Sequence, residues 1–82
     1  MAKCWTYKYG ADEVKVLNKG FNGSELYVNG ELCDQKRGIS LSDHLSVTLK
    51  GGEKVTATLE GTVTMTCSLL VNGTPLEPVD VK

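Results

Sequence analysis

The stretch Leu26-Tyr27-Val28-Asn29-Gly30-Glu31-Leu32 decides the fold, and a second stretch, Leu69-Leu70-Val71-Asn72-Gly73-Thr74-Pro75, repeats its pattern. In each stretch an apolar run leads into Asn-Gly. This dipeptide tolerates positive φ at both positions and therefore favours a type I′ turn, whose twist matches that of the flanking strands. The sequence therefore predicts a chain built from β-hairpins.

The turn at Asn29-Gly30 sets the register of the first hairpin. The predicted pairs are Val28 with Glu31, Tyr27 with Leu32, and Leu26 with Cys33. Both faces of this hairpin then carry apolar side chains. Such a hairpin suits the middle of a small barrel, or a sheet whose second face is covered by a loop or a partner chain.

The following hairpins are predicted from the same alternation of side chains. A three-residue loop, Lys50-Gly51-Gly52, pairs the inward residues of one strand with the inward residues of the next. A two-residue turn at Gly51-Gly52 would instead pair inward with outward residues. The predicted pairs are Val47 with Val55 and Leu45 with Ala57, followed across a turn at Glu60-Gly61-Thr62 by Leu59 with Val63 and Ala57 with Met65. Residues 62–71 then form the clearest strand, with Val63, Met65, Cys67, Leu69 and Val71 pointing inward.

Two segments are less regular. Leu41, Leu45 and Leu49 are four residues apart, so residues 40–45 fit a short helical turn, and a strand from His44 or Leu45 through Leu49 is the alternative that we favour. Pro75 and Pro78 lack a backbone N–H, which makes the last segment an edge strand or an extended tail.

The fold class that follows is all-β. We expect residues 1–82 to form one domain of seven or eight short antiparallel strands, arranged as a sandwich or a small open barrel. Val14 and Gly20 recur as Val55 and Gly61, which suggests two related units that pack as two sheets, although hairpins also resemble one another by chance.

The composition limits the classes of function. Nine basic and ten acidic residues leave a net charge of −1, which disfavours a nucleic-acid partner or an anionic membrane surface. The N-terminal residues lack the apolar core of a signal peptide or membrane span, so we expect a cytoplasmic protein.

The two Val-Asn-Gly hairpins carry a family resemblance. Residues 24–32, followed by a second Leu-Leu-Val-Asn-Gly at residues 69–73, resemble the β-sandwich domains of Fas apoptotic inhibitory molecule, in which a strand ending in Val-Asp/Asn-Gly recurs. The resemblance implies a non-enzymatic β-sandwich that acts through protein contacts. It implies no particular functional residue.

The cysteines and the histidine are the candidates for catalytic or metal-binding chemistry. Cys4, Cys33 and Cys67 are widely spaced, and with His44 they lack the paired spacing of a zinc site; a Cys4–Cys33 disulfide is a minor alternative. Asp43 adjoins His44, but neighbours on a strand point to opposite faces and cannot form a triad. We therefore expect no enzyme, no metal and no cofactor, and keep an enzyme using Cys33 or His44 as the third hypothesis.

An aromatic strand face is the candidate ligand site. Trp5, Tyr7 and Tyr9 alternate onto one face, with Lys8 close by, so they form either part of the core or a platform for stacking a sugar or single-stranded nucleic acid. Burial is favoured because each aromatic left in water would forgo about 2 kcal/mol. We therefore expect a non-catalytic interaction module acting through protein contacts or self-association, with a stacking ligand module as the alternative.

Overall fold

The fold is taken from a computed structural model, which describes residues 2–38, 41–61 and 64–82. Antiparallel strands make up nearly all of its regular structure, as the abundance of valine and threonine predicts. The elements are β1 (Lys3–Tyr9), β2 (Asp12–Asn18), the 3₁₀ turn η1 (Gly20–Asn22), β3 (Ser24–Val28), β4 (Glu31–Lys36), β5 (Ser42–Thr48), β6 (Lys54–Glu60), β7 (Thr66–Val71), β8 (Thr74–Leu76) and β9 (Asp80–Val81).

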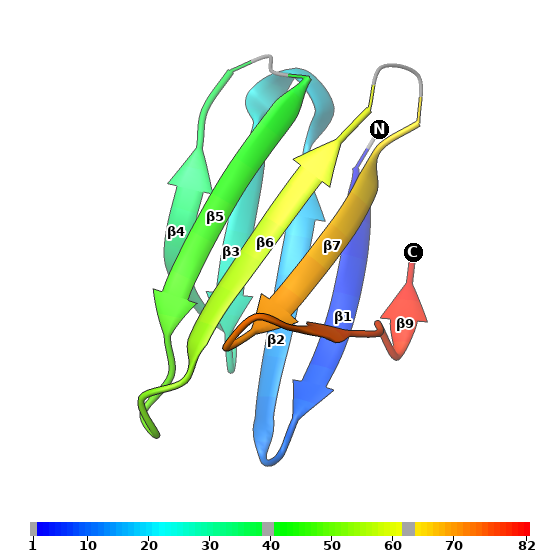
Figure 1. The fold of residues 1–82 in the computed structure, drawn as a ribbon. Coiled ribbons are helices and arrows are strands. Elements are labelled where there is room, and N and C mark those ends of the chain that lie inside the picture. Colours follow the sequence, from blue (N-terminus) through cyan, green and yellow to red (C-terminus); the bar gives the residue numbers. More distant parts are fainter. Residues whose placement is uncertain (1, 39–40, 62–63) are drawn as a thin grey trace.

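The strands form two antiparallel sheets that pack face to face (Figure 1). The first sheet has the order β4-β3-β2-β1-β9 and the second has the order β5-β6-β7-β8. The prediction of an all-β fold is confirmed, and the sandwich is the alternative that the chain adopts. The strand number exceeds the predicted seven or eight because the proline-containing tail forms two short edge strands, β8 and β9.

The two sheets share one construction. Each contains four consecutive strands that pair in chain order, and the third of these strands is followed by an Asn-Gly turn. Asn29 and Asn72 have φ of 52° and 50°, and the glycines after them both have φ of 83°, as type I′ turns require. In each turn the asparagine side chain accepts a hydrogen bond from a backbone N–H of the neighbouring strand, Glu13 in one sheet and Lys54 in the other, both at 2.9 Å. The repeated sequence pattern thus corresponds to a repeated arrangement.

The first hairpin contains a bulge that the alternation of its residues does not predict. Val28 pairs with Glu31 and Tyr27 with Leu32 as predicted, but Leu26 pairs with Asp34 instead of Cys33. The register shifts between Leu26 and Tyr27, because β4 holds one residue more than β3 at this point. The predicted Leu26–Cys33 pair is therefore wrong, and Cys33 lies exposed.

The β5–β6 hairpin has the predicted register, whereas the predicted register of β6 against β7 is wrong. Val47 pairs with Val55 and Leu45 with Ala57, as the three-residue loop requires, and the strand alternative holds for residues 42–48. Residues 39–40 and 62–63 lie outside the described residues. Between β6 and β7, Leu59 pairs with Cys67 and Ala57 pairs with Leu69. The predicted partners, Val63 and Met65, are each wrong by four positions, and β7 begins at Thr66 instead of residue 62. Since four is even, the inward face is unchanged.

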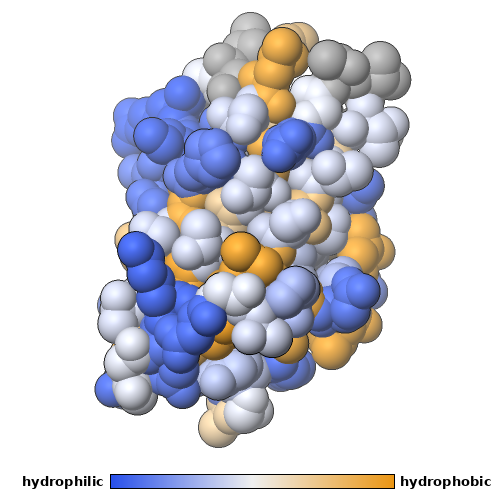
Figure 2. All heavy atoms as spheres, viewed as in Figure 1, coloured by the Kyte–Doolittle hydropathy of each residue, from blue (hydrophilic) through white to orange (hydrophobic). Residues whose placement is uncertain are grey.

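The core lies between the sheets and contains Leu69 and Val71 of the predicted inward set, with Met65 and Cys67 half-buried against it. Its buried apolar members are Trp5, Tyr7, Val14, Val16, Leu26, Leu45, Leu49, Val55, Ala57, Leu59, Leu69 and Val71. The outer face of the second sheet carries hydroxyl groups instead, including those of Ser46, Thr56, Thr58, Thr66 and Ser68. Figure 2 views this face, which is mostly pale with the strongly hydrophilic residues mainly at its margins.

One carboxylate joins the edge strands of the two sheets. Asp34, on β4, accepts hydrogen bonds from the backbone N–H of its neighbour Gln35 at 2.8 Å and of Ser46 on β5 at 2.9 Å. These N–H groups would otherwise face an added strand, and an occupied edge resists pairing with another chain. At the opposite side, β8 contains Pro75 and β9 has two residues, which also weakens strand addition.

Replacing Asp34 with alanine should therefore weaken the contact between the edge strands β4 and β5. We expect the free energy of unfolding to fall by about 1–2 kcal/mol, since two backbone N–H groups lose a charged acceptor. We also expect concentration-dependent association. Urea denaturation and light scattering at several concentrations measure both effects, with Asp34→Asn, which keeps one acceptor oxygen, as the intermediate case. An unchanged urea midpoint together with a strictly monomeric variant would show that Asp34 neither stabilises this edge nor prevents association through it.

Candidate functional site

The predicted aromatic face lies largely in the core. Trp5 and Tyr7 are 4% and 0% exposed, so their ring faces are not presented to a ligand, and Tyr9 packs half-buried against the same core. Burial raises the pKa of the Tyr7 hydroxyl well above its usual range, and this hydroxyl donates to Cys67 Sγ at 3.3 Å. Lys8 forms a surface ion pair with Glu13 at 3.1 Å. The structure thus places Trp5 and Tyr7 in the core, which is the interpretation favoured from the sequence.

The residues considered for chemistry stay apart. The three cysteines are free thiols, and the described residues hold no cluster of metal-binding side chains. Burial raises the pKa of the Cys67 thiol, which disfavours the reactive thiolate. Asp43 is buried and accepts a hydrogen bond from Ser24 at 2.8 Å, whereas His44 is exposed beside the Thr58 hydroxyl at 3.3 Å. Asp43 and His44 therefore point to opposite faces of β5, as strand alternation requires.

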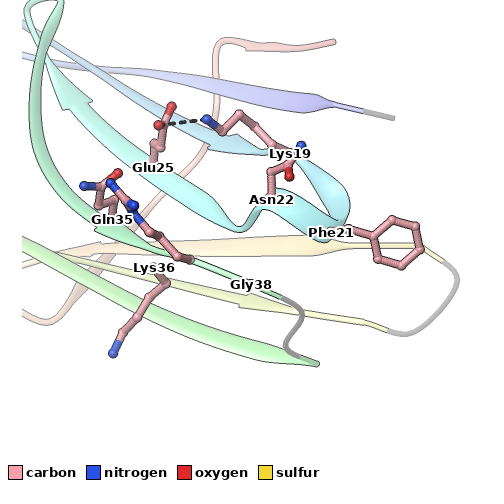
Figure 3. A pocket seen from close by; sticks show the side chains of 8 residues that line it. Lys19, Phe21, Asn22, Glu25, Gln35, Lys36 and Gly38 are labelled. Atoms are coloured by element: carbon pink, nitrogen blue, oxygen red, sulfur yellow. Dashed lines mark hydrogen bonds and ion pairs between the residues drawn. The ribbon is translucent and has the colours of Figure 1, made fainter.

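A polar hollow beside η1 is the candidate site (Figure 3). It has a volume of about 500 Å³ and lies between the loop that joins β2 to β3 and the end of β4. We call it the η1–β4 hollow, and its lining residues are Lys19, Phe21, Asn22, Glu25, Gln35, Lys36, Arg37 and Gly38. The two walls lie at the open end of the β3–β4 hairpin, where Ser24 pairs with Lys36 and Glu25 with Gln35.

Gly23 holds the two walls of the hollow together. Its φ of 93° lies in the region that favours glycine, and a Cβ placed on it would lie 1.9 Å from the Lys36 carbonyl oxygen. The η1 loop therefore packs directly against the backbone of β4. Lys19 closes the loop by donating its backbone N–H to the Gly23 carbonyl at 2.7 Å.

The rim of the hollow exposes an aromatic ring. Phe21 is the only phenylalanine of the chain and is 79% exposed. Figure 3 shows its ring projecting beyond the η1 turn, away from the side chains of β4. An exposed aromatic side chain forgoes the favourable transfer out of water, and such residues are enriched in protein-binding surfaces.

The floor of the hollow contains an ordered charge network. Glu25 accepts hydrogen bonds from the Tyr27 hydroxyl at 2.7 Å and from the Lys19 ammonium at 3.0 Å. These bonds hold the pKa of Glu25 below its usual range, and the bond to Glu25 raises the pKa of Tyr27. Lys36 and Arg37, in contrast, are exposed and form no ion pair with any residue that the structure describes.

Glu25 should make the fold sensitive to acid. Because its pKa is lowered on folding, its contribution to stability is fully present above its usual pKa of 4.5 and is lost as the pH falls below that value. We expect Tyr27→Phe, which removes the first hydrogen bond, to raise the pKa of Glu25 toward its usual value and to reduce this acid sensitivity. Carboxyl ¹³C shifts followed through a pH titration measure it; an unchanged Glu25 titration in Tyr27→Phe would contradict the assignment.

Part of this site is visible in the sequence. Residues 19–24 stand out as a glycine-punctuated loop with the only Phe, and residues 34–38 as a charged strand exit. Their contact follows from the β3–β4 hairpin, in which Ser24 pairs with Lys36, but the close approach of Gly23 to the Lys36 carbonyl does not follow from the alternation of side chains. No pattern of side-chain periodicity reports a backbone contact of that kind.

Comparison with protein-family models, with curated proteins and with solved structures gave no match. The resemblance to the domains of Fas apoptotic inhibitory molecule therefore rests on the hairpin residues alone. The structure shows a small all-β domain of two antiparallel sheets. Among the described residues, there is no helix whose length and apolar character would let it cross a membrane.

Proposed function

We propose that this chain is a non-catalytic module that binds other proteins through the η1–β4 hollow. The observation that carries the proposal is the 79% exposed Phe21, which lines the same hollow as Lys36 and Arg37, two exposed cations without ion-pair partners among the described residues. Phenylalanine and arginine are both enriched at protein interfaces relative to the rest of the surface. The resemblance noted for the Asn-Gly hairpins implies the same class of function.

The choice of another protein over a second copy of this chain rests on the strand edges. Self-association by strand addition needs an open edge, and Asp34, Pro75 and the shortness of β9 all oppose it. The three free thiols fit the reducing cytoplasm as the place where the module works.

Two measurements test this function. Light scattering should report a monomer at every concentration, and selection from a random peptide library displayed on phage should yield peptides whose binding is lost in the Phe21→Ala, Arg37→Glu double variant. A dimer that forms as the concentration rises would instead assign the contact to copies of this chain. Failure to select any peptide that depends on Phe21 and Arg37 would overturn the proposal.

A further inference from the structure

We infer that the η1–β4 hollow takes an acidic peptide segment of a partner protein, with a carboxylate on Arg37 and an apolar side chain on Phe21. The inference rests on the proposed function and adds the chemical class of the partner. Three features support it: the cationic lining of the hollow, the exposed guanidinium of Arg37 and the exposed ring of Phe21.

The charge of the hollow is opposite to that of the whole chain. Its lining carries three cations, Lys19, Lys36 and Arg37, against the single carboxylate of Glu25. The chain as a whole has a net charge of −1. A cationic site on a weakly acidic protein selects an anionic ligand locally and does not attract anions over the rest of the surface.

Arg37 is the cation best placed for a ligand carboxylate. Lys19 is engaged by Glu25 at 3.0 Å, and Figure 3 shows the Lys36 side chain directed away from Glu25 and Gln35. Arg37 lines the hollow, is exposed and has no ion-pair partner among residues 2–38, 41–61 and 64–82. Its planar guanidinium can donate two parallel hydrogen bonds to one carboxylate.

The remaining lining residues suit a peptide. The carboxamides of Asn22 and Gln35 are exposed, and each can donate to a peptide carbonyl and accept from a peptide N–H. Phe21 stands at the rim, so a segment that crosses from Arg37 to the η1 turn would bring an apolar side chain onto its ring. The ligand is therefore an extended segment with an acidic residue and an apolar residue a few positions apart.

A nucleic acid fits these observations less well. Single-stranded binders follow the phosphate backbone with a long basic groove and stack several bases on aromatic rings. Here the unpaired cations of the hollow are Lys36 and Arg37, and its aromatic lining residue is Phe21.

Fluorescence anisotropy with synthetic peptides tests the inference. The probe is a labelled peptide of about ten residues in which glutamates and aspartates flank a leucine, compared with the same peptide carrying lysines in place of its acidic residues. The acidic peptide should bind, and Arg37→Glu and Phe21→Ala should each weaken it by about tenfold or more. Lys50→Glu makes the same charge change on an exposed residue of the β5–β6 turn, at the far end of the sandwich, and should change affinity by less than about twofold. The lysine peptide should not bind.

The outcomes separate this inference from the proposed function. If the phage-selected peptides depend on Phe21 and Arg37 but are neutral or basic, the acidic partner is overturned and the protein-binding function stands. If Lys50→Glu weakens the acidic peptide as much as Arg37→Glu, binding follows net charge and the site is wrong. If labelled oligouridine binds through Arg37 and the acidic peptide does not, the partner class is wrong.

Discussion

Replacing Gly23 with alanine is expected to lower the free energy of unfolding by about 3 kcal/mol or more, and to abolish peptide binding at the η1–β4 hollow. Two effects add: a φ of 93° strains any residue with a Cβ, and the new methyl would overlap the Lys36 carbonyl oxygen. The chain relieves the overlap only by moving η1 away from β4, which separates the two walls of the hollow.

Gly52→Ala provides the matched control. Gly52 also has φ of 93°, but a Cβ built on it meets nothing within 4 Å, so it carries the strain without the overlap. We expect a loss of about 1 kcal/mol for Gly52→Ala, with binding unchanged. Guanidinium denaturation of both variants measures the difference. Equal losses in the two variants would mean that the contact between Gly23 and β4 does not shape the site.

Replacing Ser24 with alanine is expected to cost about 3 kcal/mol. The Ser24 hydroxyl is 0% exposed, donates to Asp43 at 2.8 Å and accepts from the Asn18 amide at 3.1 Å. This chain of hydrogen bonds joins β2 and β3 of one sheet to β5 of the other. Its loss leaves a carboxylate, itself only 5% exposed, without the hydrogen bond from Ser24 at the sheet interface.

A double-mutant cycle tests that explanation. If the cost of Ser24→Ala comes from the stranded carboxylate, then Ser24→Ala combined with Asp43→Ala should be less destabilising than the two single losses added, by about 1–3 kcal/mol. Ser68→Ala, on the exposed face of β7, should change stability by less than about 0.5 kcal/mol. Additive losses would assign the effect to packing rather than to the Ser24–Asp43 bond.

The sequence predicts well whatever alternation and turn chemistry determine. The Asn29-Gly30 and Asn72-Gly73 turns formed as predicted because positive φ at two successive positions is a local property of those residues. Leu69 and Val71 point inward as predicted even though the predicted β6–β7 register was wrong. The observed partner of Leu59, Cys67, lies an even number of positions from the predicted partner, which leaves the faces of the strand unchanged.

Features that depend on tertiary packing were not predictable in this way. The bulge that turns Cys33 outward comes from the fit of β4 against β3, with Asp34 bonded to β5. The same limit applies to the candidate site. Phe21, Trp5 and Tyr7 are all aromatic, so residue type alone does not separate them. Only the packing of the sheets shows which aromatic ring is left in solvent.

The measurement that tests the binding site most directly is a titration of the isotope-labelled protein with the acidic peptide, followed by the shifts of its backbone amides. We expect the largest changes on residues 19–25 and 35–38, which form the two walls of the hollow. Largest changes on the hydroxyl face of β5, β6 and β7, or shifts spread evenly over the surface, would contradict it.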